Sequence, residues 1–376
     1  MYIYSRLFGI FTYCLTLLIF LFFIKNDVNK RNSKVIFFFF LLFLTIIAYF
    51  YAPAPEADLY RIQIYAIDFS KYSWSEFFSL LMKNQIGLSS TPISAILYRI
   101  LGLTGNVKLI SAFSCAFTYG LVFYVIFKES KRLNVSSYSL FFVVLLMFSM
   151  DYYMPVIATI RSYLASVLIF FNIYLENKNG KINIINLLIY LVAILTHSIG
   201  IVLVIIRFIS LIFQKSYKLT HKIIYLMIIF LTSIFLFSSA DNLLIDLINR
   251  FSYYSSSNDS YSYAWEYICL FIMLFIQCSV LYTLHNKKRI LKNFKLDIYY
   301  DISKFCAIIL ILFCWQFSFF QRISFFLFLL EIPLMLLINN KKIKLKYIIL
   351  NKSTLLIFVL MLLTVSRGYL CSLKFW

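Results

Sequence analysis

The chain has 376 residues, of which 62% are hydrophobic and 13% charged, and its formal net charge is +20. With only 8 glycines and 5 prolines it lacks the composition of flexible linkers, so we expect one integral membrane domain over residues 1–376. The positive charge lies in short loops beside apolar runs, where membrane topology and anionic lipid head groups explain it, and we therefore expect no nucleic-acid partner.

The apolar runs predict the fold class. A bilayer core needs about 20 helical residues to cross it, and helices and closed barrels are the structures that satisfy their own backbone there. The runs lack the strict polar alternation of barrel strands. We predict an all-α polytopic membrane protein with about twelve transmembrane helices. The expected spans are 7–24, 35–51, 107–127, 137–151, 160–175, 183–197, 198–213, 223–239, 265–285, 304–320, 322–338 and 347–366.

The first run, 7–24, resembles a signal peptide in length. A basic loop follows it directly, without a small-residue cleavage site, so we interpret it as a retained first span. The 7 cysteines fall almost entirely within spans and form no CxxC pair, so we expect them to be buried and apolar.

Basic residues mark every second loop. The basic loops are 25–34, 128–132, 178–181, 215–222, 287–295 and 341–346, and the positive-inside rule predicts that they face the cytoplasm. The segments between them, including the loops 52–91 and 239–264, are then external. Both termini are predicted outside.

The external loop 52–91 is the longest segment between spans. Ser73 and Glu76 have the spacing of a capping box, which opens a helix. Trp74, Phe77, Phe78 and Leu81 follow at helical spacing, so we expect this helix to lie along the outer membrane interface. The next apolar segment, 91–100, is too short to span. If it crossed, the basic loop 128–132 would lie outside, so we expect a re-entrant or surface helix.

Two later stretches depart from regular spans. Residues 182–213 form one apolar run of 32 residues, which would be about 48 Å long as one helix. Both of its ends carry lysine, so we expect it to fold back near residues 196–198 into two short helices with an external tip. The spans on either side of the linking segment 151–155 are also short, which predicts an outward-facing cavity that enters the bilayer.

Ionisable groups at membrane depth are expensive and are functional candidates. Arg161 opens a span, His197 lies at the folded-back tip, and Arg322 lies at another external boundary. Asp58 and Arg61 lie three residues apart, as neighbours on one helical turn. Each has a simpler interpretation: the arginines as interfacial anchors, His197 as the cap of its turn, and Asp58 with Arg61 as a local ion pair. Their shared external placement favours a site for a phosphate-bearing substrate.

No nucleotide or metal motif accompanies these residues. The sequence contains no GxxxxGK[ST], GxGxxG or HExxH pattern and no Cys/His cluster. We therefore expect no cofactor and no metal, and any activity would use an energised substrate.

Four short segments resemble a known family. Residues 54–61 (APEADLYR), 160–165 (IRSYLA), 193–198 (AILTHS) and 320–325 (FQRISF) occur in this order. In order and topology they are similar to the EpsG-type branch of the Wzy polysaccharide polymerases. The resemblance covers nearly the whole chain through topology. The chain departs from the family at 85–90 (QIGLSS), where members often carry an acidic residue.

The resemblance implies a nucleotide- and metal-independent glycosyltransferase of the bacterial cytoplasmic membrane. It would join undecaprenyl-diphosphate-linked repeat units into O-antigen, capsular or exopolysaccharide on the outer face. The catalytic candidates are His197 and Asp58, and Arg161, Arg322 and Arg61 would bind the diphosphate. Possible substrate contacts are Glu56, Tyr60 and Gln321. The expected partners are lipid-linked glycans, membrane lipids and a chain-length regulator.

Two alternatives remain open at this stage. A ligase related to O-antigen ligases shares the external Arg and His chemistry and would differ in its acceptor. A flippase or other transporter of lipid-linked oligosaccharide should show internal pseudo-symmetry between its halves. The long external loop occurs once in this chain, so the sequence favours the polymerase over the transporter.

Overall fold

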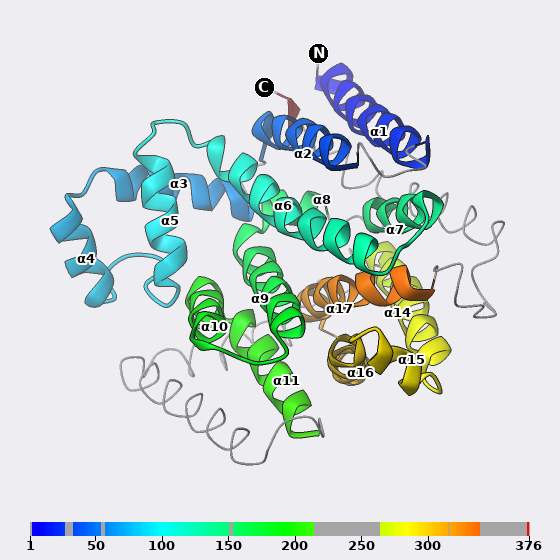
Figure 1. The fold of residues 1–376 in the computed structure, drawn as a ribbon. Helices are drawn as coiled ribbons and strands as arrows, with labels where there is room; N and C mark the ends of the chain where they lie inside the picture. The colour runs from blue at the N-terminus through cyan, green and yellow to red at the C-terminus, as the bar shows by residue number, and fades with distance from the viewer. Residues whose placement is uncertain are drawn as a thin grey trace.

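The computed structural model describes residues 2–26, 33–53, 57–149, 153–213, 264–314, 316–338 and 374–375. Of these, 83% are helical, which agrees with the all-α prediction. The helices are α1 (Tyr2–Asn26), α2 (Ser33–Tyr49), α3 (Asp58–Ser70), α4 (Trp74–Met82), α5 (Pro92–Gly102), α6 (Leu109–Arg132), α7 (Ser137–Ser149), α8 (Tyr153–Ala158), α9 (Ile160–Asn179), α10 (Ile184–Thr196), α11 (Ile199–Phe213), α14 (Ala264–Leu284), α15 (Lys288–Asn293), α16 (Asp297–Leu312) and α17 (Phe317–Ile338) (Figure 1). Two short strands, β1 (Tyr51–Ala52) and β2 (Lys374–Phe375), pair antiparallel.

Two helical segments of the described part are long and apolar enough to cross a membrane, Leu109–Arg132 and Phe319–Ile338. Several shorter apolar helices accompany them, including α2, α10 and α11. The outer faces of α1 and α2 expose large apolar side chains, among them Leu18, Phe22 and Phe38. A continuous apolar outer surface is unusual for a soluble monomer and is typical of helices that face lipid.

The predicted spans inside the described part of the chain each coincide with a helix, whereas 223–239 and 347–366 lie outside it. The span predicted at 304–320 is wrong at both ends. The helix α16 begins at Asp297 and ends at Leu312, and residues 317–320 belong to α17. The polar first turns of α16 are helical because Asp297 lies at the N-terminus, where the macrodipole favours an acid, and because Lys304 pairs with Asp301 at 2.9 Å. A hydropathy pattern alone does not register such polar ends.

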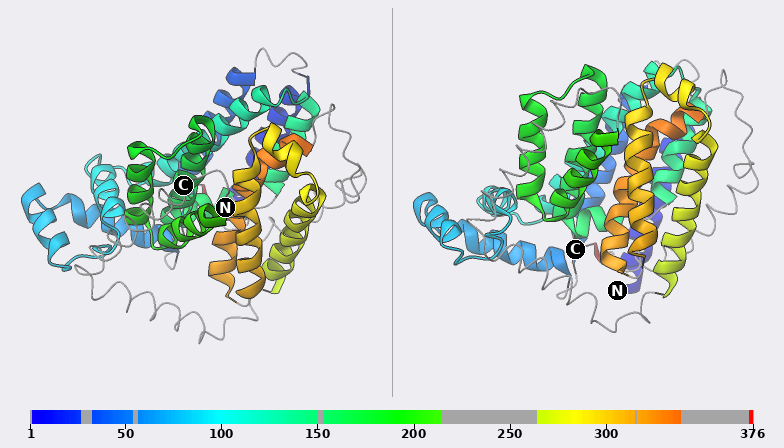
Figure 2. Two further views of the ribbon diagram at one scale, coloured as in Figure 1. Left: turned by 60° about the horizontal axis from the view of Figure 1, so that its bottom comes forward. Right: turned by 90° about the horizontal axis from the view of Figure 1, so that it is seen from below.

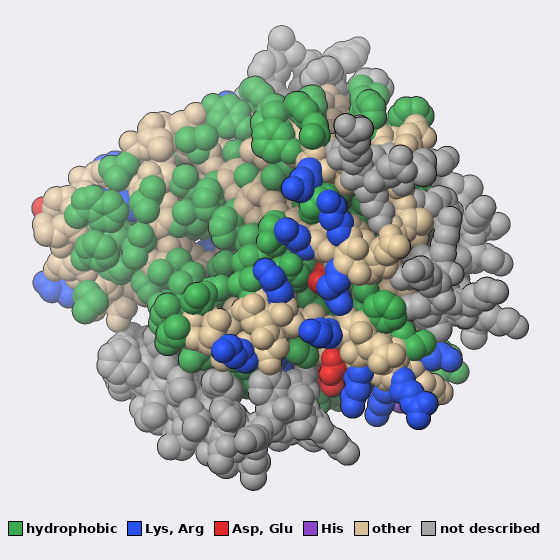
Figure 3. Space-filling view, in the orientation of Figure 1, with side chains coloured by type: hydrophobic (Ala, Val, Ile, Leu, Met, Phe, Trp, Pro, Cys, Tyr) green, Lys and Arg blue, Asp and Glu red, His purple; other side chains and the backbone are tan. Residues whose placement is uncertain are grey.

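The predicted basic loops 128–132, 178–181 and 287–295 lie in the described part of the chain and share one end of the bundle (Figure 2), whereas 215–222, 341–346 and most of 25–34 lie outside it. On the face seen in Figure 3, Lys and Arg side chains gather over the ends of α6, α9 and α15. Arg132, the last residue of α6, donates a hydrogen bond to the carbonyl of Phe294, just after α15, and Lys34 at the start of α2 lies 5.6 Å from the Phe127 ring of α6. The helices α3, α4 and α5 lie toward the opposite end (Figure 2). The fold therefore separates the basic loops from the segment predicted to be external.

The predicted capping box opens α4. The Ser73 hydroxyl accepts from the Glu76 N–H at 3.3 Å, and the Ser73 N–H donates to Glu76 Oε2 at 2.8 Å. The predicted apolar stripe is only half buried: Phe77 and Leu81 face the core, while Trp74 and Phe78 stay exposed. The exposed pair stacks at 5.7 Å, an amphipathic surface of the kind found at membrane interfaces.

The short apolar segment after α4 forms α5, which packs closely along α3. A Cβ on Gly102 would lie 2.1 Å from the carbonyl oxygen of Ala66, so only glycine permits this approach. The buried Arg99 donates to the carbonyl of Phe69, in the last turn of α3, and to that of Tyr72, just after α3. Helices α3, α4 and α5 thus form one packed unit.

The long apolar run folds back where predicted. The helix α10 ends at Thr196 and α11 begins at Ile199, with His197 in an extended conformation between them. A Cβ on Gly200 would lie 2.5 Å from the Ala193 carbonyl oxygen, so glycine lets the two helices meet in this tight turn. The segment 151–155, by contrast, was expected as a link, and part of it forms the start of the short helix α8.

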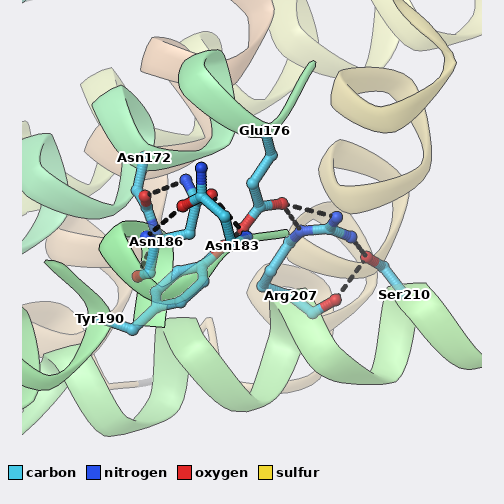
Figure 4. A network of polar contacts seen from close by, with 7 residues as sticks. All are labelled: Asn172, Glu176, Asn183, Asn186, Tyr190, Arg207 and Ser210. Atoms are coloured by element: carbon cyan, nitrogen blue, oxygen red, sulfur yellow. Dashed lines mark hydrogen bonds and ion pairs between the residues drawn. The ribbon is translucent and has the colours of Figure 1, made fainter. Parts of the chain in front are cut away.

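A buried polar network joins α9, α10 and α11 (Figure 4). Arg207 donates to Glu176 Oε2 from Nε at 2.9 Å and from a terminal nitrogen at 2.7 Å, and both side chains are fully buried. The Tyr190 hydroxyl donates to the other Glu176 oxygen. Nearby, Asn172 and Asn186 exchange hydrogen bonds between α9 and α10. Each of these side chains has a hydrogen-bond partner in the network, and the network fixes the three helices relative to one another.

The first prediction concerns sidedness. With Ser79→Cys on the exposed face of α4 and Asn179→Cys or Asn293→Cys at the basic end, an impermeant maleimide applied to intact cells should label only the first. The readout is mass-shifted protein on a gel, with permeabilised cells as the control in which all three react. Labelling of Asn179→Cys in intact cells would invert the orientation.

The second prediction concerns the buried ion pair. Glu176→Ala leaves the Arg207 guanidinium buried without its anion, so unfolding in detergent should lose about 3–5 kcal/mol of stability. The double variant Glu176→Leu with Arg207→Met removes both charges and should recover most of that loss, as measured by thermal unfolding. Equal losses in the single and double variants would contradict this account.

Candidate functional site

Two separate helices, α3 and α9, bring charged groups together beside α5. Asp58 opens α3, and Arg161 is the second residue of α9. Asp58 Oδ1 lies 3.9 Å from a terminal nitrogen of Arg161 and 3.6 Å from one of Arg61. The aspartate that the sequence singled out therefore sits between two of the predicted phosphate-binding arginines.

The packing explains why these segments meet. The helix α3 contacts α5 along its length and also contacts α8, and a single residue, Thr159, separates α8 from α9. The start of α9, with Arg161, is thereby held beside the start of α3. On the other side, the Ser94 hydroxyl of α5 donates to the Thr196 carbonyl of α10 at 2.7 Å, which ties α5 to the turn that carries His197.

The two ion pairs are loose. At 3.6 and 3.9 Å the nitrogen–oxygen distances exceed those of a charge-assisted hydrogen bond, so Asp58 attracts both guanidinium groups without saturating either. The Arg161 side chain is 14% exposed, whereas that of Arg61 is 64% exposed. Because solvent screens the exposed pair, Arg161 carries the stronger field in this site.

Two buried donor groups in the site have no hydrogen-bond partner among the described residues. They are Nε of Arg161 and the hydroxyl of Tyr98, a fully buried residue of α5. Burial raises the pKa of the Tyr98 hydroxyl above its ordinary value, with Arg161 opposing the shift and Asp58 adding to it. The hydroxyl therefore stays neutral and able to donate. A buried guanidinium nitrogen and a buried hydroxyl, both without a partner, are suited to binding an oxyanion.

His197 caps its own turn and follows Thr196, whose carbonyl accepts from Ser94 of α5. It is buried, and its Nδ1 accepts a hydrogen bond from the Ile199 N–H at 3.1 Å. A neutral imidazole that accepts at Nδ1 carries its proton on Nε2. In this arrangement His197 offers a donor through Nε2, whereas Asp58 offers carboxylate oxygens that can accept a proton.

The remaining predicted residues are more peripheral. Gln321 and Arg322 are half-buried in the second turn of α17, and no contact in the described part joins them to Asp58. Tyr163 of α9 packs on Phe325 of α17 with ring centroids 4.6 Å apart, so the starts of these helices lie side by side. Tyr60 is exposed on α3, and Glu56 lies outside the described residues.

Sequence reasoning missed Tyr98. It treated residues 91–100 as an apolar segment, although the hydroxyl-bearing residues Thr91, Ser94 and Tyr98 recur there at spacings of three and four. That spacing places them on one face of a helix, which is a signal that could have been used. In the structure Ser94 contacts the α10 turn and Tyr98 lies within the electrostatic reach of Asp58 and Arg161.

The described residues contain no cluster of three or more His, Cys, Asp or Glu side chains that could hold a metal ion. Comparison of the chain with protein-family models, with curated proteins and with solved structures finds no match in any of the three. Functional reasoning therefore starts from the chemistry of this site.

The third prediction uses the unpaired hydroxyl. A buried hydroxyl without a partner costs free energy, so Tyr98→Phe should raise the stability of the ligand-free protein by about 1–3 kcal/mol. The matched control is Tyr190→Phe, which removes an equally buried hydroxyl that donates to Glu176 and should lower stability. Thermal unfolding in detergent measures both. A destabilised Tyr98→Phe would mean that the hydroxyl already has a partner.

Proposed function

We propose that this protein is a polysaccharide polymerase of the EpsG and Wzy type, which transfers a growing glycan from undecaprenyl diphosphate to a lipid-linked repeat unit. The observation that carries the proposal is the pair of unpaired buried donors, Arg161 Nε and the Tyr98 hydroxyl, beside an aspartate loosely held between two arginines. This arrangement supports the binding of a diphosphate next to a proton acceptor.

The reaction requires both a binding site for the diphosphate and an acceptor for a proton. The acceptor hydroxyl attacks the anomeric carbon of the donor sugar, a new glycosidic bond forms, and the bond to the diphosphate breaks with its electron pair leaving on the diphosphate oxygen. Negative charge thus develops where Arg161 and Tyr98 can donate. A guanidinium contacts phosphate with two parallel hydrogen bonds, so Arg161 is the principal ligand, with Arg61 and Arg322 as outer contacts.

The acceptor's proton goes to Asp58 in this scheme. A general base must lie within hydrogen-bond reach of the hydroxyl that it deprotonates. Asp58 has two acceptor oxygens. A diphosphate bound at Arg161 would replace Asp58 as the partner of that arginine and leave the carboxylate facing the substrate. His197 acts as a hydrogen-bond donor through Nε2, because its Nδ1 is occupied by the Ile199 N–H.

The setting proposed for the enzyme is the outer face of the bacterial cytoplasmic membrane, with about twelve spans and both termini outside. The gathering of the described basic loops, 128–132, 178–181 and 287–295, at the end away from α3, α4 and α5 (Figure 2) supports this orientation. The substrate carries its own activated bond, so the reaction needs neither nucleotide nor metal. A chain-length regulator is the expected protein partner.

The fourth prediction tests catalysis directly. Purified protein in detergent, mixed with lipid-linked repeat unit and no nucleotide, should form a ladder of oligomers on a gel. A flippase would form none, because detergent removes the compartments that transport requires. A folded protein with authentic substrate that forms no ladder would overturn the polymerase.

Two arginine variants refine the same assay. Arg161→Lys should lower the rate roughly 100-fold, because an ammonium group lacks the planar fork that stabilises developing charge. Arg61→Lys is the matched control: this arginine also pairs with Asp58 but is largely exposed, so its loss should stay within about tenfold. Equal effects of the two substitutions would remove Arg161 from the diphosphate site.

A further inference from the structure

The helix α17 carries a carboxyl group in its apolar interior. Glu331 lies in the candidate span Phe319–Ile338 and is fully buried. Neither of its carboxyl oxygens has a hydrogen-bond partner among the described residues. The helix itself packs against α9, α14 and α16 at the centre of the bundle (Figure 1). A carboxyl group in this position is far from the Asp58 site and has no part in the proposed glycosyl transfer.

The neighbouring helices α14 and α16 carry polar groups of several kinds. The electrostatic field of its carboxyl reaches the thiols of Cys278 on α14 and Cys306 on α16. Beside these cysteines in sequence, Gln277 Oε1 and the hydroxyl of Ser303 are also buried without a partner in the described part. The Gln277 amide nitrogen is already used, since it donates to the Ser324 carbonyl at 3.0 Å.

The helix contributes one more acceptor. Pro333, two residues beyond Glu331, has no N–H, so it cannot pair with the carbonyl of Leu329 one turn earlier. The Leu329 carbonyl and the Gln277 amide oxygen are acceptors only, whereas the Ser303 hydroxyl and the thiols can also donate. Buried acceptors without donors are costly, and a bound cation or a proton would relieve that cost.

Four cations of the neighbouring helices have acidic partners other than Glu331. On α6, Arg132 pairs with Glu129, and on the helices around α9, Arg207 pairs with Glu176. Arg161 faces Asp58, and Lys304 of α16 pairs with Asp301. Within the described residues, no Lys or Arg forms an ion pair with Glu331. An ionised carboxylate in this position would lie in a medium of low dielectric without a counter-ion.

We propose that Glu331 is a proton-binding site inside the membrane domain. Its carboxyl group holds a proton at neutral pH, because an ionised carboxylate there would be fully buried without a counter-ion among the described residues. A proton fits better than an alkali metal ion, because the groups that the field of this carboxyl reaches on α14 and α16 include thiols, which are poor ligands for hard cations. The inference does not depend on the proposed polymerase activity.

The site has a structural consequence for α17. The same helix carries Gln321 and Arg322 at its other end and packs against the start of α9, where Arg161 lies. Release of the proton would place a bare charge in the helix interior and weaken its packing on α14 and α16. Proton binding at Glu331 can therefore change the packing of α17, the helix that carries Arg322.

The experiment uses infrared spectroscopy on the full-length protein in detergent or vesicles. A protonated carboxyl has a carbonyl stretching band that an ionised one lacks. We expect this band at neutral pH in the wild type and its loss in Glu331→Gln. The matched control is Glu176→Gln: this carboxylate is equally buried but pairs with Arg207, so its substitution should leave the band unchanged.

A stability measurement on the same two variants completes the test. Glutamine is a neutral isostere, so Glu331→Gln should unfold at the wild-type temperature, whereas Glu176→Gln should unfold several degrees lower because Arg207 loses its anion. Two results would overturn the proposal: a neutral-pH wild-type spectrum without the Glu331 band, or a band that disappears on addition of sodium ions, which would make the site a metal-ion site.

Discussion

The buried ion pair between Glu176 and Arg207 holds the part of the fold on which the candidate site depends. Both groups lie in an apolar interior, where charges persist only when fully paired and hydrogen-bonded. Their contact, extended by Tyr190, fixes α9, α10 and α11 as one unit. Arg161 begins the first of these helices and His197 follows the second, so the distant network sets the positions of both.

Buried polar atoms without a partner among the described residues occur both beside Asp58 and at Glu331. Near Asp58 they are Arg161 Nε and the Tyr98 hydroxyl, which can donate, whereas at Glu331 they are the two carboxyl oxygens, which accept when the group is ionised. An apolar environment makes each group costly to leave without a partner. The donors therefore favour an anion, whereas the Glu331 carboxyl favours a proton, so the two places are suited to different chemistry.

Much of the fold and part of the site were predictable from local patterns. Helical spans follow from apolar run length, the α4 capping box from Ser73 and Glu76, and the α10–α11 turn from a run too long to cross once. The pairing of Asp58 with Arg61 follows from three-residue spacing on one helix. The polar start of α16 at Asp297 was missed, because hydropathy measures the membrane portion of a helix and ignores its ends.

The sequence by itself determined the all-α class, the alternation of basic loops and the candidate residues, because these depend on composition and on spacing along one chain. Only the tertiary structure decided which residues meet. Asp58 and Arg161 are 3.9 Å apart although the helices α4 to α8 separate them in sequence, and the buried Tyr98 joins them only through the packing of α5 on α3. Whether a buried group has a partner is likewise a property of packing: Glu176 and Glu331 are the same residue type in apolar helices, yet only the first has Arg207 beside it, because contacts between helices depend on how their faces are turned toward one another.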